Sequence, residues 1–304
     1  MKDGLNSLIR TYSDYLKRKY QRKIFRVGLS TGIPCPHRIQ HGGCIFCHQE
    51  TFTGEYQTRG LTVAQQLEEA IPRILDTCGD VGLIAYFQDE TSTAGSLDFL
   101  REQYQAALAH PEILGLIVST RPDYIEQPVI DLLKSLPVPV TVEIGLQTIH
   151  NASLQFLNRG HDFAQADEAI RRCGENDLET GVHLIIGIPG ESREDIKDTI
   201  RYVSGNPCIS QVKFHNLVAY KNTPLAKMVR NSNLNILDID QYIEILGDIL
   251  PLLRSDIVIT RLFTSNIRRS QIALGNYSGS KPEWLNRLQL YLLANNIHQG
   301  KNIL

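Results

Sequence analysis

The sequence lacks an apolar run long enough to span a bilayer, and residues 1–6, Met-Lys-Asp-Gly-Leu-Asn, lack the apolar region of a signal peptide. Neither sign of charge prevails, because 31 Lys and Arg residues stand against 33 Asp and Glu residues. No global field therefore draws the chain to a membrane or to nucleic acid, and any site for a polyanion must be local. We expect a cytoplasmic protein with no membrane partner and no evident obligate protein partner.

Cysteine is scarce over most of the chain. Cys78, Cys173 and Cys208 are scattered, so a second metal cluster is not expected. In a reducing compartment they are better explained as buried thiols than as disulfide halves. The other three cysteines fall within residues 35–47, Cys-Pro-His-Arg-Ile-Gln-His-Gly-Gly-Cys-Ile-Phe-Cys.

This cysteine stretch, residues 35–47, has the features of a metal site. Cys44 and Cys47 have the spacing that reaches one metal centre from one loop, and the two glycines before them allow a tight turn. With Cys35 they supply three thiolates, one fewer than a four-coordinate centre needs. A metal centre with an open position is more often catalytic than structural.

Two interpretations of the stretch are open at this point. In one, Cys35, Cys44 and Cys47 hold a four-iron cluster whose fourth iron takes an exogenous ligand. In the other, a histidine completes a structural Cys3His zinc site. The candidate histidines are His37, His41 and His48.

Strand-like and helix-like segments alternate up to about residue 223. This alternation of six strands with helices is typical of a parallel sheet or an α/β barrel. A chain of 304 residues can accommodate such a barrel, which needs about 250. The expected strands are 24–29, 81–87, 115–119, 138–146, 181–187 and 209–215, and the expected helices are 62–77, 96–109, 127–135, 162–177 and 192–204.

The pattern divides the chain into three expected parts. Residues 1–22 contain a basic amphipathic helix over 5–20, and residues 23–223 form the barrel core. The rhythm breaks in residues 224–304, which we expect to form a C-terminal α/β extension. The predicted fold is thus a partial (β/α)6 TIM-type barrel with an N-terminal helix and this extension. Helices near 238–252 and 283–295 flank an apolar run at 257–263.

Polar residues gather at the carboxyl ends of the expected strands, where chemistry collects in parallel barrels. On the fourth strand, Glu143 and Gln147 share the face opposite to a row of apolar residues, so they should point into the barrel. Several polar residues that face the barrel interior indicate a cofactor pocket. A structural zinc site does not require such a pocket, so the iron–sulfur interpretation gains support. The other candidates are Gln88, Ser119, Arg121, His183, Lys213 and His215.

A series of motifs resembles the radical S-adenosylmethionine (SAM) superfamily. The resemblance is strongest to bacterial proteins of similar length that are related to the catalytic subunit of the elongator complex, and it covers nearly the whole chain. It rests on the cysteine stretch and on residues 12–20, 85–88, 120–123, 143–148, 158–161, 183–191 and 212–215.

This resemblance implies a specific chemistry. Cys35, Cys44 and Cys47 would hold a [4Fe-4S] cluster whose fourth iron binds the amine and carboxylate of SAM. The reduced cluster would cleave SAM to methionine and a 5′-deoxyadenosyl radical, which abstracts hydrogen from a substrate. A reductant such as flavodoxin or ferredoxin would supply the electron. The protein would be a transferase or an oxidoreductase.

The family pattern also implies contacts to SAM. Phe46 would lie beside the adenine, Gln88 near the methionyl group, and the backbone at Gly187 against the adenine. Arg159 suits a carboxylate, and a helix-surface ion pair is its alternative role. Residues 88–91, Gln-Asp-Glu-Thr, depart from the family pattern, which leaves the methionine contact or the substrate preference open. Further SAM contacts are expected from Glu143 and Gln147, and contacts shared with substrate from Ser119, Arg121, His183, Lys213 and His215.

The resemblance implies a tRNA substrate, modified at a wobble-uridine side chain. The basic residues from Lys17 to Arg26, with Arg261, Arg268 and Arg269, would contact its phosphates if folding brings them together. A porphyrin-like or other small metabolite is the alternative substrate, because residues 145–159 are similar to oxygen-independent coproporphyrinogen oxidases. A zinc-stabilised nucleic-acid-binding module without catalysis is the third interpretation.

Overall fold

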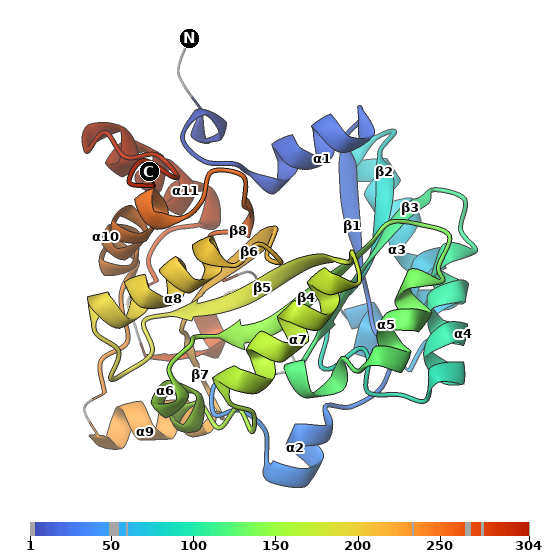
Figure 1. The fold of residues 1–304 in the computed structure, drawn as a ribbon, viewed down its shortest axis with the longest axis horizontal. Helices are drawn as coiled ribbons and strands as arrows, with labels where there is room; N and C mark the ends of the chain where they lie inside the picture. Colours follow the sequence, from blue (N-terminus) through green and yellow to red (C-terminus); the bar gives the residue numbers. More distant parts are fainter. Residues whose placement is uncertain are drawn as a thin grey trace.

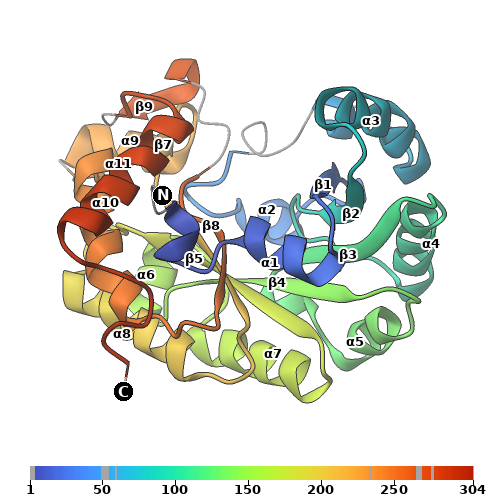
Figure 2. The same ribbon diagram turned by 90° about the horizontal axis from the view of Figure 1, so that it is seen from above.

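The computed structural model describes residues 4–48, 55–58, 60–232, 234–264, 269–274 and 277–303. Seven strands form one parallel sheet in the order β1-β2-β3-β4-β5-β6-β8, which curves into an open half-barrel (Figure 2). The predicted partial α/β barrel is therefore confirmed. The strands are β1 (Ile24–Leu29), β2 (Gly82–Phe87), β3 (Ile113–Thr120), β4 (Val140–Gln147), β5 (Glu179–Ile186), β6 (Gln211–Asn216) and β8 (Val258–Arg261).

The seventh strand extends the prediction. β8 comes from the apolar run that we assigned to the C-terminal extension, yet it pairs with β6 in the main sheet. A backbone hydrogen bond of 2.9 Å from Val258 N–H to Ser210 O begins this pairing. The sequence could not reveal it, because an apolar run indicates a strand without indicating its neighbour. The boundary proposed at residue 224 stays a prediction.

Helices cover the outer face of the half-barrel (Figure 2). Two of them begin with capping boxes at the expected starts of the helices: Thr62 and Gln65 form one at α3, as do Ser192 and Asp195 at α8. The covering helices are α3 (Val63–Cys78), α4 (Leu97–Leu108), α5 (Gln127–Lys134), α7 (Phe163–Glu175) and α8 (Arg193–Gly205).

The hydrophobic core lies between the sheet and these helices. Ile144, Val182 and Val212 are register partners on β4, β5 and β6, and each is fully buried. Side chains alternate along a strand, so the residues between them face the inside of the barrel. That inner face includes Glu143 and His183, as the parity of the sequence predicted.

The N-terminal helix is shorter than expected. Residues 5–7 form a single 3-10 turn, and α1 (Tyr12–Tyr20) begins only after Thr11, whose hydroxyl accepts from the N–H of Asp14. Thr11 also forms a bridge with Ile259 of β8. Because α1 packs at the amino ends of the strands, it lies at the opposite end of the sheet from α2, the helix of the cysteine stretch (Figure 1).

Several elements were not predicted. α2 (Pro36–His41), α6 (Asn151–Phe156), α9 (Pro224–Ser232) and the two-stranded pair β7 (Ala219–Tyr220) and β9 (Ile272–Leu274) are short. Short 3-10 turns occur at Glu55–Thr58, Pro122–Tyr124, Leu250–Leu252 and Arg269–Gln271. The two expected C-terminal helices are α10 (Ile239–Ile249) and α11 (Lys281–Ala294). Within the described ranges, every helix is too short or too polar to span a bilayer.

Candidate functional site

The cysteine stretch leaves β1 and turns around the short helix α2. Cys35 is the N-cap of this helix. Gly42 and Gly43 follow it with φ of +76° and +78°, a left-handed conformation that suits glycine. A Cβ on Gly43 would lie 3.3 Å from the Arg38 side chain, a tight contact that glycine avoids. The predicted tight turn before Cys44 is confirmed.

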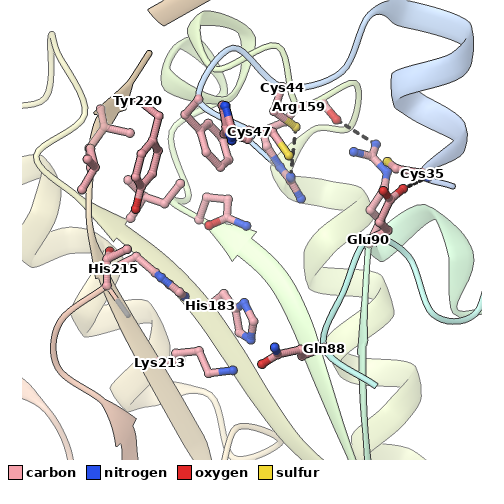
Figure 3. Close-up of a pocket in the computed structure, with 18 of the residues that line it drawn as sticks. Cys35, Cys44, Cys47, Gln88, Glu90, Arg159, His183, Lys213, His215 and Tyr220 are labelled. Carbon is pink, nitrogen blue, oxygen red and sulfur yellow. Dashed lines mark hydrogen bonds between the residues drawn. The ribbon is translucent and has the colours of Figure 1, made fainter. Parts of the chain in front are cut away.

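The three sulfurs of the stretch line one cavity of about 260 Å³ at the carboxyl ends of the strands (Figure 3). Each sulfur has a hydrogen-bond donor within reach, and two of these donors are guanidinium groups. Nearby cations favour the thiolate, which is the form that binds a metal. The contacts are Arg159 Nη1 to Cys44 Sγ at 3.3 Å, Arg38 Nη2 to Cys47 Sγ at 3.4 Å, and Thr91 Oγ1 to Cys35 Sγ at 3.6 Å.

The Cys47 thiol is partly buried beside the other sulfurs. Burial, with a smaller contribution from Cys44, raises the pKa of Cys47 to about 11, while Arg38 opposes the shift. Even with Arg38 beside it, this thiol is protonated at neutral pH unless a further positive charge lies at the sulfur. A metal centre supplies such a charge and deprotonates the thiols that it binds.

The described residues do not support a mononuclear zinc site. In the part of the chain that the structure describes, no three His, Cys, Asp or Glu side chains surround one point closely enough to hold a single ion. His37 Nε2 instead lies 2.7 Å from the carbonyl oxygen of Asn158. Three sulfurs that share a cavity wall fit a four-iron cluster better, because each thiolate then binds a different iron.

A second segment, residues 158–161, supports the cysteine stretch from behind. Asn158 Nδ2 donates to the carbonyl oxygen of Gly43 at 2.7 Å. Gly160 has a φ of +69°, and a Cβ there would lie 2.5 Å from the His37 ring. Only glycine therefore allows the two segments to approach so closely.

Arg159 lies buried between these segments. Its Nη2 donates to Gly145 O at 3.0 Å and its Nε to His161 Nε2 at 3.2 Å. Burial, with the charge of Arg159, lowers the pKa of His161 to about 4, so the ring is neutral and can accept. Arg159 has no carboxylate partner among the described residues. The alternative of a helix-surface ion pair is therefore wrong.

Glu90 is a site residue that the sequence did not single out. Its carboxylate is 2% exposed, accepts from the backbone N–H of Cys35, and forms an ion pair of 2.6 Å with Arg38 Nη1. Glu90 thus ties the end of β2 to the cysteine stretch (Figure 3). The one available signal was its place in residues 88–91, which depart from the family pattern.

Glu143 is the centre of a hydrogen-bond network inside the barrel. Its Oε2 accepts from Tyr86 Oη at 2.6 Å, Ser119 Oγ at 3.0 Å and His183 Nε2 at 2.8 Å, and also from Lys213 Nζ. Although burial alone would raise the pKa of Glu143, Lys213 and His183 hold it well below its usual range. Burial lowers the pKa of Lys213 to about 7, although Glu143 opposes the shift.

The structure brings most of the predicted site residues together. Ser119 and Glu143 are absent from the cavity wall and lie in the buried network, and Gly187 borders a separate hollow that includes Leu237. The assigned contacts to SAM stay predictions. The wall also includes Tyr86, which the sequence did not single out, and Arg261, which was expected on a separate phosphate-binding surface. The predicted residues on the wall are Phe46, Gln88, Arg121, Gln147, Arg159, His183, Lys213 and His215, with Cys35, Cys44 and Cys47.

The basic residues that were expected to contact phosphates do not form one surface. Lys19 and Arg22 are held by Glu179 and Asp80, at 3.0 and 2.7 Å, at the end of the barrel away from the cysteines. Arg261 borders the cavity instead. Arg268 and the side chain of Arg269 lie outside the described residues. The expected grouping is therefore wrong for Lys19 and Arg22, whereas Arg26, the last residue of the basic run, lies near Arg261.

Comparisons with known proteins give consistent matches. Residues 35–203 match the radical SAM superfamily, and residues 209–293 match the radical SAM C-terminal domain. The YhcC protein of Escherichia coli K12 is 32% identical over 275 residues, which are 88% of this chain and 87% of that protein. A tRNA uridine(34) acetyltransferase of Methanocaldococcus jannaschii is 29% identical over 141 residues, 46% of this chain and 26% of that protein.

Among solved structures, the chain resembles the archaeal Elp3 of Methanocaldococcus infernus with a TM-score of 0.69 and 17% identity. The match covers 91% of this chain and 64% of the Elp3 chain, so this chain spans slightly less than two thirds of that protein. At this level of identity, the likeness shows the fold.

Proposed function

This chain belongs to the radical SAM superfamily, and from that premise we propose that it modifies a tRNA at the cavity of its half-barrel. Members of the superfamily are enzymes that use a [4Fe-4S] cluster and SAM, so the predicted family, enzyme class and cofactors are confirmed. The interpretation as a zinc-stabilised module without catalysis is therefore wrong.

We assign the cluster to Cys35, Cys44 and Cys47. The observation that carries this assignment is that all three sulfurs line one end of a cavity whose other end is the polar interior of the barrel. The donor set also fits, because three thiolates leave one iron of a four-iron cluster for SAM. When bound, the cluster and SAM supply one-electron chemistry that begins with reductive cleavage of the sulfonium.

The surrounding residues have distinct tasks in this proposal. Arg38 and Arg159 offset the negative charge of the sulfurs, since each places a guanidinium nitrogen within 3.4 Å of one. Glu90 fixes the backbone at Cys35. Gln88 and Gln147, which line the cavity, offer amide groups to the polar ends of SAM.

The tRNA assignment rests on similarity to proteins named as tRNA uridine(34) acetyltransferases, and it extends to a wobble-uridine side chain as the group modified. These matches cover about half to three quarters of this chain. Radical SAM enzymes need an electron donor, and we propose a flavodoxin or ferredoxin.

A small metabolite is the second candidate substrate. The cavity is about 260 Å³, and the most basic helix, α1, lies at the far end of the barrel (Figure 1). A tRNA would therefore have to bind around the cavity mouth without the cations of α1. Comparison of tRNA nucleosides and small metabolites between a wild-type and a deletion strain separates the two substrates.

The radical SAM assignment is tested by anaerobic reconstitution with iron and sulfide, followed by dithionite and SAM. We expect release of 5′-deoxyadenosine from the wild type and its loss in Cys44→Ala. Cys208→Ala is the matched control, because this cysteine lies away from the cavity wall. Undiminished release by Cys44→Ala, or no release by the wild type, would refute the proposal.

A further inference from the structure

The end of the cavity away from the cysteines contains a row of basic side chains. His183, Lys213 and Arg261 are register partners on β5, β6 and β8, and all three line the cavity. Figure 3 shows His183 and Lys213 at the opposite end of the cavity from Cys44 and Cys47. The row is therefore separate from the proposed cluster site.

Arg26 on β1 reaches the same region from across the barrel. Its guanidinium lies 4.9 Å from the centre of the Tyr12 ring and 5.3 Å from that of Tyr86. Its positive charge contributes to lowering the pKa of Lys213 and that of Arg261, so all three cations lie close to one another. We call Arg26, Lys213 and Arg261 the cationic floor.

One carboxylate faces the cationic floor. Glu143 is the acidic group that acts on Lys213, His215 and Arg261 alike. Burial lowers the pKa of His183 to about 4 and that of His215 well below its usual range, so both rings are neutral. Two guanidinium groups and the Lys213 ammonium thus stand against a single negative charge.

One oxygen of this carboxylate, Oε2, already accepts four hydrogen bonds within the barrel. The donors are Tyr86, Ser119, His183 and Lys213. Arg261 forms no hydrogen bond or ion pair with the residues that the structure describes, and burial lowers its pKa. Arg26 Nη1 is buried and also has no hydrogen-bond partner within the described chain.

Most cations at the cysteine end have a partner. Arg38 pairs with Glu90 and contacts a sulfur, and Arg121 pairs with Asp123 at 2.9 Å. Arg159 contacts the sulfur of a proposed cluster ligand instead of a carboxylate. The guanidinium groups of the floor have neither kind of partner among the described residues. Burying a cation without a counterion is costly, so a surplus of this kind is expected where a ligand supplies the anion.

We propose that the cationic floor binds an anionic group of the substrate, either a carboxylate or a phosphate. This inference rests on the proposed function, since it assigns SAM to the cysteine end of the cavity and the substrate to the other. Arg261 is the residue best placed to bind the group. A guanidinium offers two parallel donors to carboxylate or phosphate oxygens, and this one has no hydrogen-bond or ion-pair partner for its side chain among the described residues.

The test uses the reconstituted full chain and isothermal titration calorimetry under anaerobic conditions. Sodium phosphate and sodium acetate are titrated separately at constant ionic strength. We expect one site per chain and an affinity that Arg261→Gln weakens about tenfold or more, because hydrogen bonds to charged groups are lost. Arg261→Lys should weaken it less. Arg201→Gln, which removes one positive charge from the exposed face of α8, should bind as the wild type does.

Several results would overturn the inference. These are a wild type that binds neither anion, an Arg261→Gln variant that binds both anions undiminished, and complete displacement of the anion by saturating SAM, which would assign the floor to the SAM carboxylate. Stronger binding of phosphate would indicate a phosphorylated substrate, and stronger binding of acetate a carboxylate. Release of 5′-deoxyadenosine without anion binding would refute this inference alone, whereas anion binding without that release would refute the radical SAM proposal alone.

Discussion

The ion pair between Glu143 and Lys213 offers a quantitative test of how the barrel interior is built. Both side chains are 2% exposed, and the pair is joined to Tyr86 and Ser119 by hydrogen bonds. Removing one partner leaves the other charge buried without compensation. We expect Glu143→Gln or Lys213→Met to lower the free energy of unfolding by about 3–5 kcal/mol each.

The double variant Glu143→Gln/Lys213→Met should be much less unstable than the sum of the single variants. The reason is that no unpaired charge remains buried, and replacing both members of such a pair is often nearly neutral. We therefore expect a coupling energy of at least about 3 kcal/mol from the double-mutant cycle, comparable to the cost of one single variant. Urea unfolding of the reconstituted protein at pH 6, where Lys213 is charged, provides the four stabilities.

The exposed pair Arg201–Glu194 on α8 provides the control cycle. These side chains are about half exposed, so solvent screens their interaction and the coupling energy of this cycle should be far smaller than that of the buried pair. Additivity of the Glu143 and Lys213 single changes within about 0.5 kcal/mol would refute the account of a buried network held together by opposite charges.

Three further predictions concern pH, backbone and cluster. The pKa of Lys213 is about 7 in the folded chain, below its unfolded value, so the unfolded chain binds more protons between pH 7 and 10. The free energy of unfolding of the wild type should therefore rise with pH by up to about 1.4 kcal/mol per pH unit relative to that of Lys213→Met. Equal pH slopes for the two proteins would contradict this. Gly160→Ala should lower the free energy of unfolding by about 1–3 kcal/mol more than Gly190→Ala. Both glycines have positive φ, but only at Gly160 would the added Cβ lie 2.5 Å from another side chain, the His37 ring. Glu90→Gln removes a negative charge next to Cys35 and should raise the midpoint potential of the cluster in an anaerobic redox titration followed by electron paramagnetic resonance; an unchanged potential would remove Glu90 from the electrostatics of the site.

Much of the fold could be predicted because its signals are local. Capping boxes at Thr62 and Ser192 begin α3 and α8 as expected. The alternation of side chains correctly placed Glu143 and His183 inside the barrel. The short helices α2 and α6 were missed because six residues give too little periodicity to recognise.

The candidate site was predictable to a similar extent. The cysteine spacing indicated the metal site directly, and the strand ends indicated the polar residues around it. Glu90 was missed because its contact with Cys35 spans 55 positions in the sequence. Arg261 was expected to contact phosphates, but its place in the cavity was not foreseen because its strand was assigned to the extension. Pairings between distant segments have no periodicity that a single sequence displays.

The sequence by itself determined which cysteines could hold a cluster, where strands alternate with helices, and which strand residues face inward, because each of these follows from neighbours along the chain. Only the tertiary structure decided that α1 closes the end away from the cysteines and that β8 brings Arg261 beside Lys213. The charge balance of the cavity is therefore a tertiary property. It depends on side chains from β1, β4, β6 and β8, which are brought together only when the sheet curves.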